Sequence, residues 1–87
     1  MYVIMVYDVN VERVNKILKI ARKYLHWVQN SVLEGEITPA NLERLKKEIT
    51  KNIDKTTDTV IFYKLRTTKY LTKETIGITK GQPTNII

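Results

Sequence analysis

A single carboxylate follows the first apolar run of the chain. Residues 2–7 are all apolar or aromatic, and Asp8 comes directly after them. A side chain between a buried strand and a helix projects into a crevice that contains unsatisfied backbone amides. An acid at this place is also a common helix cap, but Asn10 is better placed to cap the helix that follows. We therefore take Asp8 as the candidate catalytic residue.

One carboxylate per chain is a poor metal site, because a hard cation prefers several oxygen ligands. The chain has no cysteine and a single histidine, which excludes sulfur-rich and histidine-rich metal sites. Two copies related by a two-fold axis near Asp8 would bring two carboxylates together, and these must share a proton or bind a cation. Mg²⁺, or Mn²⁺ in its place, could then activate water for attack on a phosphodiester. The predicted metal ligand is Asp8 of both subunits.

The charge balance favours a polyanionic partner. Fifteen Lys and Arg residues outnumber nine Asp and Glu residues, for a formal charge of +6. Arg13, Lys16 and Lys19 fall early in a predicted helix, where they could meet phosphate groups, although a solvated surface has the same composition. Tyr7 could stack on a base or simply pack in the core.

Two further polar residues give weaker signals. His26 could act as a general base, but a lone histidine at the start of a strand is more often structural. Ser31 has no histidine and acid partners in the sequence, so a serine-hydrolase mechanism is poorly supported.

These residues need elements to position them. Residues 2–7 predict a strand, and the apolar spacing over residues 11–25 predicts an amphipathic helix with Asn10 as its cap. Residues 27–37 alternate with a change of phase near Asn30 and Ser31, which fits one bent strand or two strands joined by a tight turn. Thr38 and Pro39 signal a second helix, residues 59–65 a strand, and residues 75–79 a further short strand.

The order of elements predicts an α+β fold, a ferredoxin-like βαββαβ sandwich with an extra C-terminal strand. Helices on one side leave the other sheet face open, so we expect a homodimer formed through the sheet faces. We expect one domain over residues 1–87, with residues 75–87 as a tail that pairs with the partner subunit. The start of the chain has no basic segment and too short an apolar run to span a membrane, so we expect a cytoplasmic protein without membrane contact.

Several segments together resemble a known family. They are Tyr7-Asp8-Val9 closing the first strand, Arg13-Val14 in the first helix, residues 29–35 with the sequence QNSVLEG, and Ile76-Gly77 in the tail. This combination resembles the CRISPR-associated protein two family, the small nuclease-like subunit of spacer acquisition, over nearly the whole chain.

The resemblance implies a ferredoxin-like homodimer with paired aspartates that bind a divalent metal at the interface, and Asp8 matches that position. Tyr7, Arg13 and Ser31 match positions near the family site. The family includes metal-dependent nucleases for single-stranded RNA or double-stranded DNA. Its dimer also bridges two dimers of the CRISPR integrase subunit and supports the DNA to be inserted.

Two functions follow as hypotheses. The first is a CRISPR-associated, Mg²⁺-dependent endonuclease that cleaves single-stranded RNA, double-stranded DNA or both through paired Asp8 side chains. The second is a non-catalytic scaffold that holds duplex phosphates with residues such as Lys16, Lys19 and Lys69 and bridges integrase dimers. An RNA-recognition module lacks its aromatic motif in residues 60–65, and a small-molecule regulatory domain does not explain the charge.

Overall fold

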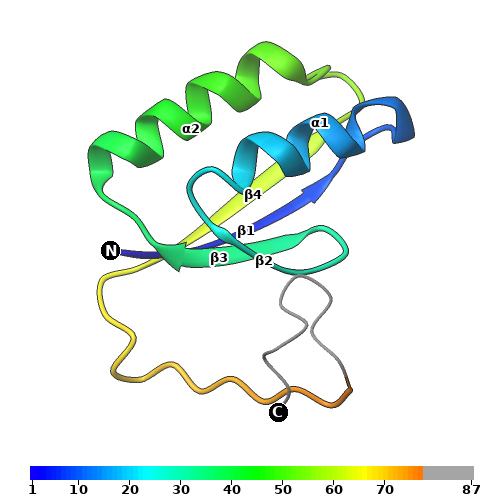
Figure 1. The fold of residues 1–87 in the computed structure, drawn as a ribbon. Helices are drawn as coiled ribbons and strands as arrows, with labels where there is room; N and C mark the ends of the chain where they lie inside the picture. Colours follow the sequence, from blue (N-terminus) through cyan, green and yellow to red (C-terminus); the bar gives the residue numbers. More distant parts are fainter. Residues whose placement is uncertain (78–87) are drawn as a thin grey trace.

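The structure is a computed structural model that describes residues 1–77. The elements are β1 (Tyr2–Asp8), α1 (Val11–Ala21), β2 (His26–Gln29), β3 (Val32–Glu36), α2 (Pro39–Asn52) and β4 (Thr59–Leu65). The strands form one sheet in the order β2-β3-β1-β4, and every neighbouring pair is antiparallel. Both helices lie on the same side of this sheet (Figure 1). The predicted ferredoxin-like βαββαβ order is therefore confirmed.

The region that allowed one bent strand or two strands contains two. Strands β2 and β3 pair around a tight turn, in which Asn30 has a φ of 40°. Asparagine tolerates this left-handed conformation better than most residues. The indole N–H of Trp27 donates to the Asn30 carbonyl at 3.0 Å, which ties the strand to its turn. A bulge between Trp27 and Gln29 accounts for the change of phase in the alternation.

The two helices differ in how they begin. Thr38 caps α2 as predicted, because its hydroxyl accepts from the Asn41 amide at 3.1 Å. Asn10 holds the capping position of α1, but its side chain makes no capping hydrogen bond, so the predicted side-chain cap is wrong. Helix α1 also ends at Ala21 and not at residue 25, although Leu25 is still buried beyond it.

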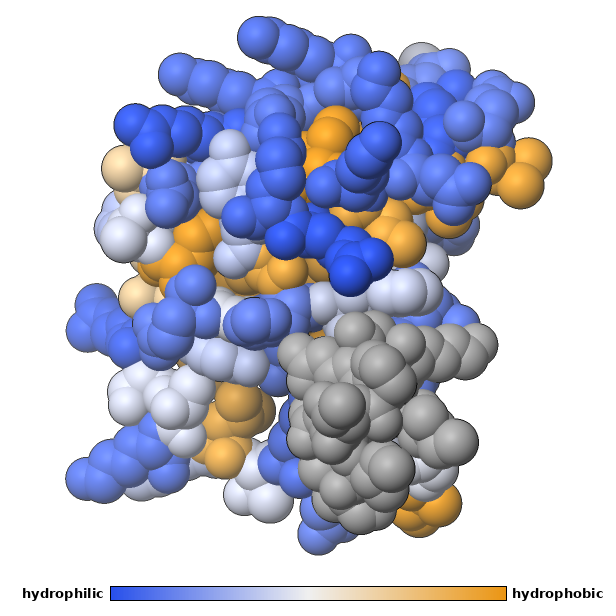
Figure 2. All heavy atoms as spheres, in the orientation of Figure 1, coloured by the Kyte–Doolittle hydropathy of each residue, from blue (hydrophilic) through white to orange (hydrophobic). Residues whose placement is uncertain are grey.

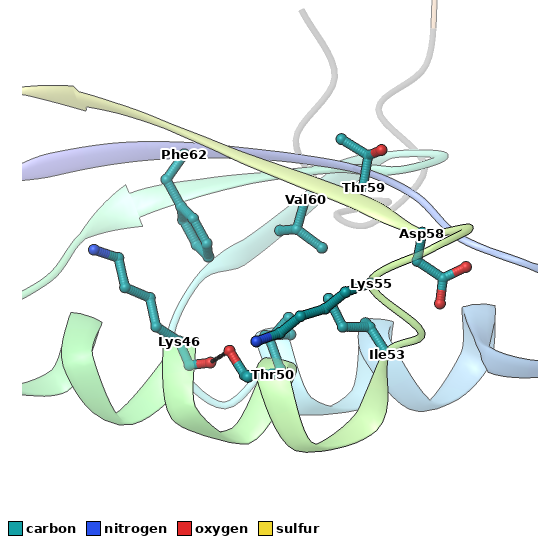
Figure 3. A pocket seen from close by; sticks show the side chains of 9 residues that line it. Lys46, Thr50, Ile53, Lys55, Asp58, Thr59, Val60 and Phe62 are labelled. Atoms are coloured by element: carbon teal, nitrogen blue, oxygen red, sulfur yellow. Dashed lines mark hydrogen bonds between the residues drawn. The ribbon is translucent and has the colours of Figure 1, made fainter.

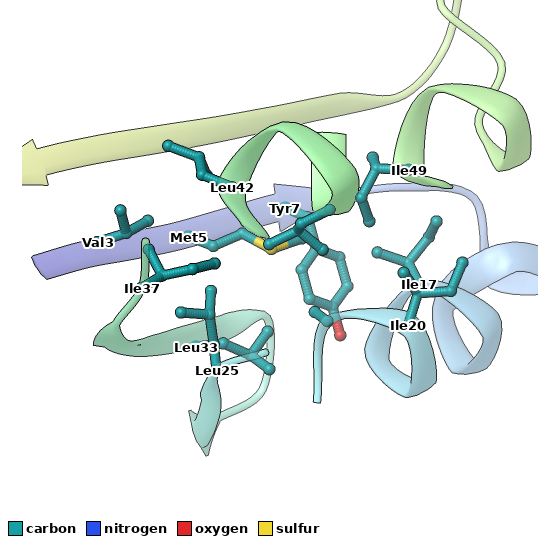
Figure 4. Close-up of a cluster of buried hydrophobic side chains, with 12 residues drawn as sticks. Val3, Met5, Tyr7, Ile17, Ile20, Leu25, Leu33, Ile37, Leu42 and Ile49 are labelled. Carbon is teal, nitrogen blue, oxygen red and sulfur yellow. The ribbon is translucent and has the colours of Figure 1, made fainter. Parts of the chain in front are cut away.

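The core lies between the sheet and the helices. Alternate residues of β1 point toward the helices and are almost completely buried: Val3, Met5 and Tyr7. They meet Leu33 of β3 and the apolar stripes of both helices, with Ile17 and Ile20 on α1 and Leu42, Leu45 and Ile49 on α2 (Figure 4). The outer surface of the helices is covered with hydrophilic residues, and hydrophobic residues emerge in the band between helices and sheet (Figure 2).

The sheet face away from the helices carries apolar side chains that are only partly covered by the rest of the chain. The register places Val6 beside Ile61 and Ile4 beside Tyr63, and Ile61 and Tyr63 are 42% and 54% exposed. The segment after β4 runs below this face (Figure 1), where Lys73 pairs with Glu34 of β3 at 3.3 Å. We call this the open face.

Only part of the segment predicted as a C-terminal strand lies within the described residues. Residues 75–77 are not a strand in the structure, and residues 78–87 lie outside the described residues. Its pairing with a partner subunit stays a prediction. Within residues 1–77, no helix combines the length and apolar character that a membrane span requires.

Candidate functional site

Asp8 is an exposed carboxylate at the last position of β1. It pairs in register with Thr59, the first residue of β4. Thr59 lies on the opposite side of β4 from Val60 and Phe62, which point toward the helices (Figure 3). Asp8 therefore belongs to the open face. Among residues 1–77 its side chain has no hydrogen bond or ion pair, so the carboxylate is available to a ligand.

A second acid lies close by in the opposite environment. The side chain of Asp58, immediately before β4, is completely buried beside the start of α1. Its carboxylate accepts from the Asn10 amide at 3.0 Å and from the Asp54 amide at 2.9 Å. The hydrogen bond from Arg13 holds the pKa of Asp58 well below its usual range. Asp58 is thus a structural acid that is charged at neutral pH.

Sequence reasoning did not single out Asp58. The signal was similar to that for Asp8: Asp58 is an acid directly beside a strongly apolar strand, although it precedes the strand and does not end it. The sequence does not reveal the antiparallel pairing of β1 with β4. This pairing brings the end of β1 beside the start of β4.

Arg13 is held by carboxylates. Its Nε donates to Asp58 at 2.6 Å, its Nη2 donates to the other oxygen of the same carboxylate at 3.0 Å, and its Nη1 donates to Glu12 at 2.9 Å. The hydrogen bond to Asp58 raises the pKa of Arg13 further above its ordinary value. Because its donors face two acids, we do not keep Arg13 among the proposed contacts to nucleic acid.

Tyr7 lies in the core. It is 3% exposed, and its ring reaches between the sheet and Ile17 and Ile20 of α1 (Figure 4). Burial raises the pKa of its hydroxyl. No ring face is open to a base, so we do not keep Tyr7 among the proposed contacts either.

Lys16 and Lys19 are exposed on α1. They are three residues apart and therefore neighbours on one helix face. Neither makes an ion pair within the described part of the chain. Both ammonium groups are thus free for phosphate.

The remaining candidates lie at different places. The carbonyl of Ser31 accepts from the Tyr7 amide at 3.0 Å, which puts Ser31 at the Asp8 end of the sheet. Lys69 follows the far end of β4, where its Nζ lies 5.5 Å from the ring centroid of Tyr70. His26 is exposed at the start of β2 and pairs with Glu34, away from Asp8. The structure puts Ser31 at the same end of the sheet as Asp8 but directs the Arg13 side chain to Asp58, and it places Lys69 and His26 elsewhere.

One copy of the chain supplies too few metal ligands. Residues 1–77 contain no group of three or more histidine or acidic side chains that could hold a metal ion. The exposed oxygens of Asp8 are of the kind that Mg²⁺ and Mn²⁺ prefer, but they are the donors of one residue. A protein site that binds a cation at Asp8 therefore needs a second carboxylate from another chain.

Comparisons with known proteins identify the family. The family model for CRISPR associated protein Cas2 matches residues 1–73. A relative from Dictyoglomus turgidum named CRISPR-associated endoribonuclease Cas2 is 59% identical over the full length of both chains. A relative of the same name from Thermotoga maritima is 60% identical over 94% of each chain.

A solved crystal structure of Cas2 agrees with this assignment. It superimposes with a TM-score of 0.84 at 41% identity and covers 100% of this chain and 97% of its own. The resemblance inferred from the strand-ending Asp8 and the QNSVLEG segment is thus confirmed by sequence and by fold. The chain belongs to the CRISPR-associated Cas2 family.

Proposed function

We propose that this chain is a CRISPR-associated endonuclease that cleaves RNA with Mg²⁺ or Mn²⁺ and works as a homodimer. The observation that carries the proposal is the exposed, unpartnered carboxylate of Asp8 on the open face. Curated relatives named endoribonucleases support RNA as the substrate. Double-stranded DNA is the alternative substrate, because phosphate contacts are alike in both.

The proposed dimer completes the site. Apolar residues on the open face, among them Ile61 and Tyr63, remain accessible in one copy. Covering them with a second copy buries apolar area and brings a second Asp8 to the two-fold axis. The two carboxylates would then hold the cation. When bound, the cation would stabilise negative charge and lower the pKa of a coordinated water molecule.

The reaction is a hydrolysis at phosphorus. A water oxygen bonds to the phosphorus and the water gives up one proton, while the bond from phosphorus to the leaving ribose oxygen breaks and that oxygen takes up one proton. The role of Asp8 is to place the cation, since a carboxylate carries negative charge and does not stabilise a phosphate by itself. Lys16 and Lys19 of α1 are free to contribute phosphate contacts that hold the polyanion.

The test is the Asp8→Asn variant, with Asn the same size and without charge. We expect cleavage of labelled RNA to fall at least about a hundredfold, because the site loses both charged ligands at once. After subunit exchange, a mixture of equal amounts of wild type and variant should have about a quarter of the activity of the same total amount of wild type. Random pairing gives about that share of dimers two Asp8 side chains. Equal residual cleavage in wild type and variant would assign the activity to a contaminant.

A second candidate function rests on a separate observation, the unpaired Lys16 and Lys19 on the outer face of α1. We propose that this face can hold duplex DNA in a scaffold that bridges integrase dimers. In that case Asp8→Asn leaves DNA binding unchanged. The Lys16→Gln and Lys19→Gln variants instead weaken DNA binding and lower its dependence on salt. An unchanged salt dependence would count against the scaffold function of these lysines.

A further inference from the structure

Asp58 is a buried acid that the proposed reaction does not use. Its carboxylate binds two parts of the chain that are far apart in sequence: the start of α1, with the residue before it, and the loop after α2. The donors to one oxygen are the Asn10 amide and the Nη2 of Arg13, both at 3.0 Å, and the hydroxyl of Thr57 at 3.2 Å. The donors to the other oxygen are the Nε of Arg13 at 2.6 Å and the Asp54 amide at 2.9 Å.

These contacts lie on both sides of Asp8. Asn10 is two residues beyond Asp8 in the chain, and Thr59, which directly follows Asp58, is the register partner of Asp8. The Asp58 carboxylate therefore binds the loop that follows Asp8. Asp58 itself directly precedes β4, the strand whose first residue pairs with Asp8. Figure 3 shows Asp58 on the helix side of the sheet, next to the start of α1, while Thr59 points the other way.

Two kinds of contact fix the loop between β1 and α1: Val9 packs against the core, and Asn10 binds Asp58. The side chain of Asn10 makes no cap, and its amide, which would otherwise be unsatisfied at the start of a helix, donates to Asp58. The Asn10 carbonyl accepts from the Arg13 amide at 2.8 Å, so the residue that grips Asp58 also closes the first turn of α1. Without the Asp58 carboxylate, the Asn10 amide and the Arg13 guanidinium both lose their acceptor.

Resting on the proposed function, we infer that Asp58 is a positioning residue for Asp8. Its bonds to Asn10 and Arg13 fix the end of β1 so that two copies present their Asp8 carboxylates at a separation that binds one cation. A cation site requires ligands placed within a few tenths of an ångström, and in a symmetric pair any shift of this loop occurs twice.

The test compares Asp58→Asn with Glu48→Gln in the full-length protein. Asparagine keeps the shape of Asp58, but it has one acceptor oxygen in place of two and its amino group faces donors. Glu48 is a matched control, because its carboxylate also binds a cation and a hydroxyl, from Lys23 and Tyr24, and joins the segment after α1 to α2. Both variants are measured at a temperature at which circular dichroism shows them fully folded.

The primary measurement is Mn²⁺ binding by electron paramagnetic resonance, and cleavage at varied Mg²⁺ is the second. We expect Asp58→Asn to raise the Mn²⁺ dissociation constant about tenfold or more and to raise the Mg²⁺ concentration for half-maximal cleavage similarly. Glu48→Gln should match wild type in both. Arg13→Lys, which keeps the charge and loses the two-pronged contact, should lie between wild type and Asp58→Asn.

The outcomes separate this inference from the proposed function. If Asp8→Asn abolishes cleavage while Asp58→Asn and Glu48→Gln both bind Mn²⁺ like wild type, the positioning role is overturned and the nuclease proposal stands. If wild type binds Mn²⁺ but cleaves neither RNA nor DNA, the nuclease proposal fails. A weaker Mn²⁺ affinity confined to Asp58→Asn would then still support the positioning role. A wild type that binds no Mn²⁺ overturns the inference, because there is no cation to position.

Discussion

Asp8 and Asp58 are the same amino acid at two strand ends that adjoin, and their surroundings give them different properties. Asp8 is exposed and has no partner among residues 1–77, whereas the Asp58 side chain is buried and accepts hydrogen bonds from the start of α1 and from the loop after α2. The first can bind a ligand from solution, and the second is satisfied by the protein. Environment, and not residue type, separates the candidate catalytic acid from the structural one.

The buried acid predicts a pH dependence of stability. Its pKa is lowered in the folded protein, chiefly by the Arg13 hydrogen bond, so the pair stabilises the fold above the ordinary aspartate pKa of about 4 and less as the pH falls below it. We expect the difference in free energy of unfolding between wild type and Asp58→Asn to be constant above about pH 5 and to shrink toward pH 2.

Urea unfolding of both proteins across this range gives that difference directly. The comparison also removes the contribution of Glu48, whose pKa is lowered chiefly by hydrogen bonds from Lys23 and Tyr24 that both proteins share. A difference that stays the same from pH 7 to about pH 2 would show that Asp58 is not held charged by Arg13.

At the scale of elements, the two helix starts show two ways to satisfy backbone amides. Helix α2 uses its own residues, with Thr38 as the cap and Pro39 in the first turn. Helix α1 uses a distant carboxylate, because Asp58 accepts from the Asn10 amide. The start of α1 therefore depends on the α2–β4 loop, and the start of α2 does not depend on a remote residue in this way.

The local cap gives a simple prediction. Replacing Thr38 by alanine removes the acceptor for the Asn41 amide and should lower the free energy of unfolding by about 1 kcal/mol. Thr50→Ala is the control, because Thr50 lies inside α2 and its hydroxyl only donates to the Lys46 carbonyl, so that alanine should be neutral or slightly stabilising. Equal losses in the two variants, measured by chemical denaturation, would show that the Thr38 contact adds nothing.

At the scale of the whole molecule, the fold is one layer of helices on one sheet, with an open face. The helix side is closed by the core, and the other side has half-exposed apolar residues and a segment that runs beneath it (Figure 1). Asp8 belongs to this open face. The proposed metal site and the proposed dimer therefore depend on the same surface.

This arrangement predicts that a charge on the open face disrupts the dimer and not the fold. Ile61→Asp puts a carboxylate where the second copy would bury apolar area, and we expect the dimer dissociation constant to rise at least about tenfold. Val11→Asp is the control, because Val11 is 86% exposed at the start of α1, where an acid is tolerated. Sedimentation equilibrium distinguishes the cases, and a wild type that stays monomeric would contradict the dimer.

The sequence by itself determined both helices, the first and last strands of the sheet, the strand-ending Asp8 and the family, and it left open one strand or two over residues 27–37. Short-range patterns carry these features: the apolar run of residues 2–7, the helical spacing that follows, and the Thr38-Pro39 helix start. Such patterns depend on residues that are near one another in the chain, so they can be recognised in the sequence alone.

Only the tertiary structure decided what Arg13, Tyr7 and Asp58 do. Arg13 pairs with an acid 45 residues away, and Tyr7 points into the core while Asp8 beside it belongs to the open face. The antiparallel pairing of β1 with β4 brings Asp58 to the end of β1, and no local pattern records that pairing. A long-range register sets which charged groups meet, and it follows from how the whole sheet packs against its helices.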